Sequence, residues 1–80
     1  MITRTDFKPW ILEALQSLGG KGYPKDVAKY IWEKKKHILQ NSGDILYTWQ
    51  YDTRWAALAL RKEGKLKAVD GRKDLPWEIA

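Results

Sequence analysis

The segment from Trp49 to Gly64 predicts one helix whose apolar residues occupy more than one side. At 100° per residue, the first apolar side consists of Trp49, Ala56, Ala59 and Leu60, and the second of Tyr51, Trp55 and Leu58. Apolar residues on two sides of a helix need cover on both sides. The chain must therefore supply two separate partners for this helix, and only a narrow polar side remains for other contacts.

Two further helices are expected before this segment. Apolar residues at helical spacing predict the first over about residues 7–18, where a Gly-Gly pair ends it. Tyr23 is expected to be extended because it precedes a proline, and that proline suits the first turn of a second helix over about 24–37. The apolar stripe of the second helix consists of Val27, Ala28, Ile31, Trp32 and Ile38. The third helix covers about 48–63, with Thr48 as its N-cap.

A β-hairpin is expected after the third helix. Polar and apolar residues alternate from Lys65 to Val69 and again from Leu75 to Ile79, and Asp70-Gly71 between them marks a tight turn. We therefore expect a hairpin over about 65–79. The whole order predicts a single α+β domain over residues 1–80 with a winged helix-turn-helix fold, a three-helix core followed by a β-hairpin wing. A three-helix domain with an unrelated hairpin shares this pattern.

The expected fold gives each apolar side of the third helix a cover. The first side should face the other two helices. The hairpin should cover the second side through Leu66, Val69 or Trp77. Asp52 falls nearest the buried side, so its carboxylate needs a partner such as Arg4 or a backbone group.

A polar wedge remains between the two apolar sides of the third helix. It consists of Gln50, Thr53, Arg54, Ala57 and Arg61, which follow one side along the helix. Arginine pairs bidentately with guanine edges or grips phosphates, and glutamine pairs with adenine. We therefore expect Gln50, Thr53, Arg54 and Arg61 to enter a DNA major groove. The alternative is that the strip is only the solvated face of the helix.

Other cations are candidates for contacts with DNA phosphates. Lys25 and Lys29 lie on the second helix, and Arg72 and Lys73 lie in the hairpin turn. Aspartates flank the two cations of the turn, so the turn carries no net charge. We therefore expect the third helix to contribute more to binding than the wing.

The charge of the chain favours a polyanionic partner. Fifteen Lys and Arg residues against ten Asp and Glu residues give a net charge of +5. A basic small domain of this kind most often binds nucleic acid. The sequence contains neither a secretory signal nor an apolar run long enough to span a membrane. Because cysteine is also absent, we expect a cytoplasmic protein with no membrane contact.

No pattern in the sequence predicts catalysis, a metal site or a cofactor. Cysteine is absent and His37 is the only histidine. The segment from Gly19 to Gly22 lacks the spacing of a phosphate-binding loop. Glu33-Lys34-Lys35 contains a fragment found in metal-dependent nucleases, but no acidic strand accompanies it. We therefore expect a non-catalytic module.

Two motifs that contain tryptophan lie in the second half of the chain. Trp55-Ala56 is followed by Leu60, Lys62 and Gly64, and later by Leu75-Pro76-Trp77-Glu78-Ile79. With Tyr23-Pro24-Lys25-Asp26-Val27, these motifs resemble the N-terminal winged-helix domain of Mrr-type restriction enzymes over about residues 7–79. That family often carries an arginine three residues before the Trp-Ala pair, where this chain has Asp52. The nuclease domain of the family has no counterpart in this sequence.

The resemblance implies a DNA-recognition module, either a part of a larger enzyme or a stand-alone relative. Together with the residues above, it leads us to expect binding of double-stranded DNA, with the third helix in the major groove and the wing on the backbone. A regulator that binds an operator as a dimer is a variant of this hypothesis. The alternative is a protein-interaction or dimerisation module. That alternative gains weight if the hairpin leaves the Tyr51, Trp55 and Leu58 side exposed together with Tyr47.

Overall fold

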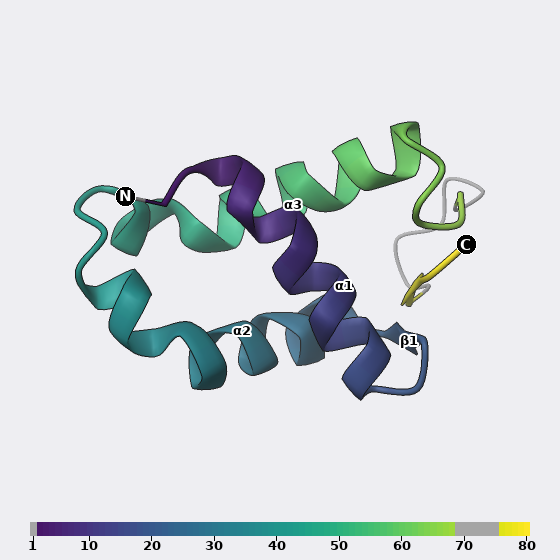
Figure 1. Ribbon diagram of the computed structural model, residues 1–80, viewed down its shortest axis with the longest axis horizontal. Coiled ribbons are helices and arrows are strands. Elements are labelled where there is room, and N and C mark those ends of the chain that lie inside the picture. Colours follow the sequence, from purple (N-terminus) through teal and green to yellow (C-terminus); the bar gives the residue numbers. More distant parts are fainter. Residues whose placement is uncertain (1, 69–75) are drawn as a thin grey trace.

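The computed structural model describes residues 2–68 and 76–80 and shows three helices with a small sheet (Figure 1). A 3-10 turn η1 (Arg4–Asp6) leads into α1 (Phe7–Ser17), β1 (Lys21–Gly22), α2 (Pro24–Gln40), α3 (Ile45–Lys62) and β2 (Trp77–Glu78). In Figure 1, α2 and α3 run in opposite directions along the long axis, and α1 crosses between them. The strands lie at the end where α3 finishes. This α+β layout is compatible with a winged-helix arrangement.

Glycines end α1 and α3, as the sequence predicts. After α3, the amide of Gly64 donates to the Arg61 carbonyl at 3.0 Å, and that of Lys65 donates to the Leu60 carbonyl at 2.9 Å. This pattern requires a left-handed residue, and Gly64 has a φ of 77°. Gly19, with a φ of 90°, ends α1 in the same way. Both helix ends therefore follow from backbone chemistry that is local to the sequence.

The segment that connects α2 to α3 is shorter than expected. α2 continues to Gln40 instead of ending near 37, and α3 begins at Ile45 instead of 48. Residues 41–44 form the turn that joins them. Thr48 therefore lies inside α3 and is not its N-cap.

The last turn of α2 is rotated relative to the expected stripe. The backbone leaves the helical region at Lys35, with a φ of −119° and a ψ of 15°. As a result Leu39 is fully buried, whereas Ile38 is 44% exposed. The expectation that Ile38 belongs to the buried stripe is wrong because the regular helical periodicity does not continue through Lys35.

One apolar core joins the three helices and the sheet. Its buried members are Phe7, Ile11, Ala14 and Leu15 of α1, Val27, Ile31 and Leu39 of α2, Ala56, Ala57 and Leu60 of α3, and Leu66 and Trp77 beyond the helices. At the edge of the core, Trp32 of α2 stacks on Trp49 of α3, with ring centroids 5.8 Å apart. The first apolar side of α3 thus faces the other helices, as expected.

The strands pair segments that are far apart in the sequence. β1 pairs with β2 in antiparallel register, with Lys21 opposite Glu78. On the other edge of β2, an antiparallel bridge joins Leu66 to Ile79. This bridge lies at the base of the hairpin expected over about 65–79, whose turn lies outside the described residues. The extended piece before α2 was expected, whereas its pairing with the C-terminal strand was not.

The sheet covers a different side of α3 from the one expected. Trp77 is only 7% exposed and lines a hollow together with Thr53 and Arg54 of α3. Tyr51 and Leu58, on the second apolar side, remain 66% and 50% exposed. The expectation that the hairpin covers the second apolar side is therefore wrong. The reason is the pairing with β1, which directly precedes α2 and holds β2 beside the start of that helix.

Replacing Trp77 by Ala tests whether β2 contributes to the core. Loss of a buried indole should lower the free energy of unfolding by about 3–5 kcal/mol, measured by urea denaturation followed by circular dichroism. In the matched control Tyr47→Ala, an aromatic ring that is 84% exposed is removed. The control should change the free energy of unfolding by less than about 0.5 kcal/mol. Equal effects of the two substitutions would contradict the burial of Trp77.

Candidate nucleic-acid interface

The solvent-exposed side of α3 has a composition that the sequence pattern did not predict. We call this side the outer face, and it consists of Tyr47, Gln50, Tyr51, Arg54, Leu58 and Lys62. At 100° per residue, Tyr47 lies about 20° and Leu58 about 40° from Arg54 around the helix axis. Arg54 is thus near the centre of the face, with Gln50 toward the sheet and Tyr51 toward η1. The outer face is a mixture of cationic, amide and aromatic side chains.

Thr53 and Ala57 of the expected polar wedge do not belong to the outer face. Thr53 is 2% exposed, and its hydroxyl donates to the Trp49 carbonyl at 2.7 Å. A buried hydroxyl that is already hydrogen-bonded cannot reach a base edge. The expectation that Thr53 enters a groove is therefore wrong. Ala57 is 1% exposed. Thr53 borders the same hollow as Trp77 of β2 and the start of α2, and Ala57 belongs to the apolar core.

Gln50 and Arg54 border a hollow between α3 and the start of α2. Lys25 and Trp77 line the same hollow. Gln50 also borders a second hollow, which Lys29 lines on α2. The structure therefore brings four of the expected DNA-contacting residues, two on each helix, to adjoining positions on one surface.

Arg61 lies between Gln50 and Arg54 around the axis of α3, but it is half-buried, unlike these two exposed residues. Its Nε atom is buried and has no hydrogen-bond partner in the described part of the chain. Its entry into a groove stays a prediction. Arg72 and Lys73, expected at the hairpin turn, lie outside the described residues.

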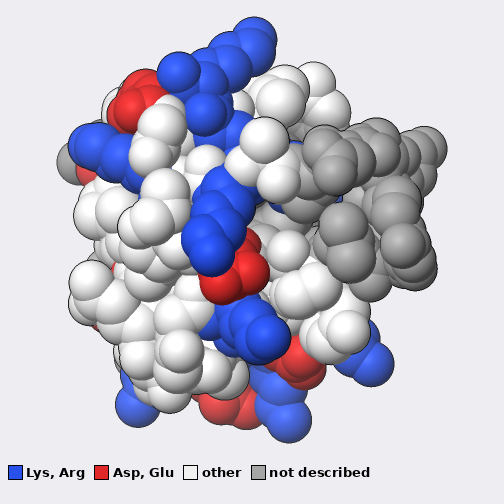
Figure 2. All heavy atoms as spheres, turned by 90° about the vertical axis from the view of Figure 1, so that its right-hand side faces the viewer, with Lys and Arg blue, Asp and Glu red and all other residues white. Residues whose placement is uncertain are grey.

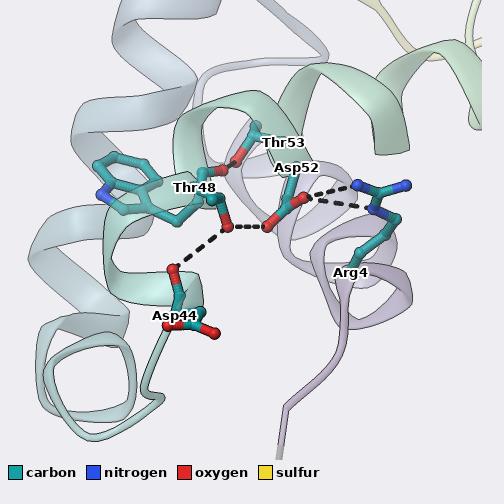
Figure 3. A network of polar contacts seen from close by, with 6 residues as sticks. Arg4, Asp44, Thr48, Asp52 and Thr53 are labelled. Carbon is teal, nitrogen blue, oxygen red and sulfur yellow. Dashed lines mark hydrogen bonds and ion pairs between the residues drawn. The ribbon is translucent and has the colours of Figure 1, made fainter.

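Asp52 anchors the side of α3 that faces away from the sheet. The residue is 3% exposed, and its carboxylate accepts from Arg4, with Nη2 at 3.2 Å and Nε at 3.3 Å from Oδ1. The Thr48 hydroxyl donates to Oδ2 at 2.8 Å (Figure 3). Arg4 also lies over the rings of Tyr51 and Trp55, at 5.7 and 4.8 Å from their centroids. The expected Arg4 partner of Asp52 is confirmed, and η1 supplies part of the cover that the hairpin does not.

A second ion pair ties α1 to the end of α3. Lys8 Nζ lies 2.5 Å from Oε2 of Glu63, just after the last turn of the helix. The hydrogen bond from Lys8 lowers the pKa of the Glu63 carboxyl, and Lys65 adds to the effect. A carboxyl with a lowered pKa stabilises the fold above its unfolded-state pKa. That stabilisation is lost as the pH falls through the lowered value.

Charges of both signs are mixed at the end of the molecule where α3 finishes and α2 begins. Figure 2 shows Lys and Arg side chains spread over this end, with Asp and Glu between them. The outer face itself contains two cations, Arg54 and Lys62, and no acidic residue. Any polyanion would therefore meet a few specific cations and not a broad basic patch.

Comparisons of the chain with protein-family models, with curated proteins and with solved structures found no match. The resemblance to the Mrr-type winged-helix domain stays a prediction. Over residues 2–68 and 76–80, the structure shows no group of three or more His, Asp or Glu residues that could hold a metal ion. In the same residues, no helix combines the length and apolar character that crossing a bilayer requires.

A double-mutant cycle tests the contact between η1 and α3. Asp52→Ala should lower the free energy of unfolding by about 1–3 kcal/mol, because Arg4 and Thr48 lose a buried acceptor. Arg4→Ala should cost less in the presence of Asp52→Ala than alone, with a coupling energy of about 1 kcal/mol. Glu33→Ala, which removes an exposed carboxylate from α2, is the control and should show no coupling to Arg4. Additive effects of Asp52→Ala and Arg4→Ala would contradict the pairing.

Proposed function

We propose that this chain is a winged-helix domain that binds double-stranded DNA without catalysing a reaction. The observation that carries this proposal is the outer face of α3, which exposes Gln50 and Arg54 and itself includes no acidic residue. Lys25 and Lys29 of α2 adjoin the same surface. The proposal places α3 in the major groove and uses the other elements to hold it there.

Helix dimensions support this assignment. α3 has 18 residues, so its length is about 27 Å, and a major groove about 12 Å wide admits a single helix. The short turn at 41–44 joins α2 to α3 as in a helix-turn-helix unit, whose first helix crosses the DNA backbone. In this pose the cations of α2 contact phosphates.

The proposed contacts divide into two kinds. Gln50 and Arg54 carry the hydrogen-bonding groups that distinguish base edges, and the half-buried Arg61 would add to them. Lys25 and Lys29 carry point charges suited to phosphates, and the hairpin turn would add Arg72 and Lys73. A role as the recognition module of a restriction system or as a regulator is consistent with these contacts. Both roles use the same surface of α3.

The small number of cations sets the salt dependence that we expect. If about four phosphates are neutralised, the logarithm of the binding constant should fall with the logarithm of salt concentration with a slope of about −3.6. Binding should therefore be strong only at low salt unless base contacts add to it. This expectation agrees with the mixture of charges seen in Figure 2.

A second candidate function is docking of a protein through the same face. It is favoured by the exposure of Tyr47, Tyr51 and Leu58, which the sheet leaves uncovered at 84%, 66% and 50%. Sedimentation equilibrium at high protein concentration distinguishes self-association from DNA binding by the monomer. A dimer whose formation Leu58→Ala abolishes would favour this second candidate.

Removing one cation from α3 and, separately, one from α2 tests the proposed DNA contact. Arg54→Ala should weaken binding to a short duplex of random sequence at least tenfold at about 50 mM salt, measured by fluorescence anisotropy, because a charged base or phosphate contact is lost. Lys25→Ala should weaken it by a smaller factor and reduce the salt slope by about 1. Lys34→Ala removes the same charge from the side of α2 that faces away from α3 and serves as the control.

The control Lys34→Ala should leave both the affinity and the salt slope close to those of the unchanged protein. Far-ultraviolet circular dichroism of each variant shows whether the helices are retained. Undetectable binding of the unchanged protein to duplex DNA at about 50 mM salt would refute the proposal. Equal losses for Arg54→Ala and Lys34→Ala would refute the assignment of the site to α3.

A further inference from the structure

Three large apolar side chains on the outer face of α3 have no cover in the structure. Tyr47, Tyr51 and Leu58 are 84%, 66% and 50% exposed. Leu58 has no polar atom, so it gains from a partner only where that partner is also apolar. Contact with a hydrogen-bonding group would leave that group desolvated and unpaired, at a cost. Leu58 therefore favours a partner with apolar groups. The cations Arg54 and Lys62 on the same face favour a partner with negative charge.

The charges on the outer face argue against a second copy of this chain as that partner. Two α3 helices packed face to face about Arg54 would bring their guanidinium groups together, and like charges at close range repel. The face contains no acidic residue that could compensate. A DNA duplex supplies negative charge along its whole length, independently of sequence.

The major groove of DNA offers one apolar group among its base edges. That group is the C5-methyl of thymine, whereas the other edge groups are hydrogen-bond donors or acceptors. A leucine or the edge of a tyrosine ring that enters the groove is best placed against this methyl. Tyr47 and Leu58 lie about 16 Å apart along α3, so apolar contacts would bracket Arg54 on both sides.

We infer that Leu58, together with Tyr47 and Tyr51, contacts thymine methyl groups in the major groove and gives the domain a preference for thymine-containing sequences. This inference rests on the proposed DNA binding. Gln50 and Arg54 supply the hydrogen bonds to neighbouring base edges. Removing one contacted methyl group should weaken binding about fourfold, the effect of withdrawing one buried carbon from an apolar contact.

Deoxyuridine provides a direct test because it lacks only the methyl group of thymine. Duplexes that the protein retains are first selected from a random-sequence pool at low salt. The selected duplexes are then synthesised again with deoxyuridine in place of each thymine in turn. The selected sequences should be enriched in thymine, and deoxyuridine at one or more positions should weaken binding about fourfold per contacted methyl.

Variants assign the effect to the outer face. Leu58→Ala should reduce the ratio of thymine to deoxyuridine affinity toward one. Arg54→Ala should weaken binding to both duplexes by a similar factor and keep the ratio. Ile38→Ala, which removes an apolar side chain of 44% exposure from the last turn of α2, is the matched control and should leave the ratio unchanged.

The outcomes separate this inference from the proposed function. Tight binding with equal affinity for thymine and deoxyuridine duplexes would overturn the inference and leave DNA binding intact. A thymine preference that survives Leu58→Ala, Tyr47→Ala and Tyr51→Ala would also overturn it, because the methyl contact would then lie elsewhere. Failure to retain any duplex would overturn both, and a dimer that buries Leu58 would point to a protein partner.

Discussion

The packing of Trp77 beside the start of α2 and the middle of α3 limits the exposed surface of α3 on one side. β2 is held there by β1, which directly precedes α2, and by the bridge between Leu66 and Ile79. Thr53, which borders the same hollow as Trp77, and the core residue Ala57 are both buried. On the opposite side, Arg4 pairs with Asp52. The outer face is the part of α3 that these two contacts leave free.

The sequence predicted the parts of the fold that depend on local chemistry. The helices follow from apolar periodicity, their ends at Gly19 and Gly64 from the left-handed backbone that glycine adopts, and the Arg4 partner of Asp52 from the cost of burying a carboxylate. The candidate site was predicted in part: Gln50 and Arg54 are exposed as expected, whereas Thr53 is buried.

The errors have a common physical origin in contacts between distant segments. A strand of two residues has almost no sequence signature, so the pairing of β1 with β2 could not be predicted from alternation. Both sides of α3 contain apolar residues, and the pattern does not say which of them the sheet covers. The departure of Lys35 from helical geometry likewise could not be predicted, because no proline or glycine lies at that position. The composition of the outer face therefore depends on contacts between distant segments, such as the pairing of β1 with β2 and the ion pair of Arg4 with Asp52.

The most direct test of this account maps the amide chemical shifts of the protein as a short duplex of random sequence is added. We predict salt-sensitive changes along the outer face, at Tyr47, Gln50, Arg54 and Leu58, and at Lys25 near the start of α2. Changes confined to the side of α2 that carries Tyr30 and Lys34, or no changes at low salt, would contradict it. Such a result would mean that the exposed side of α3 is not the surface that meets DNA.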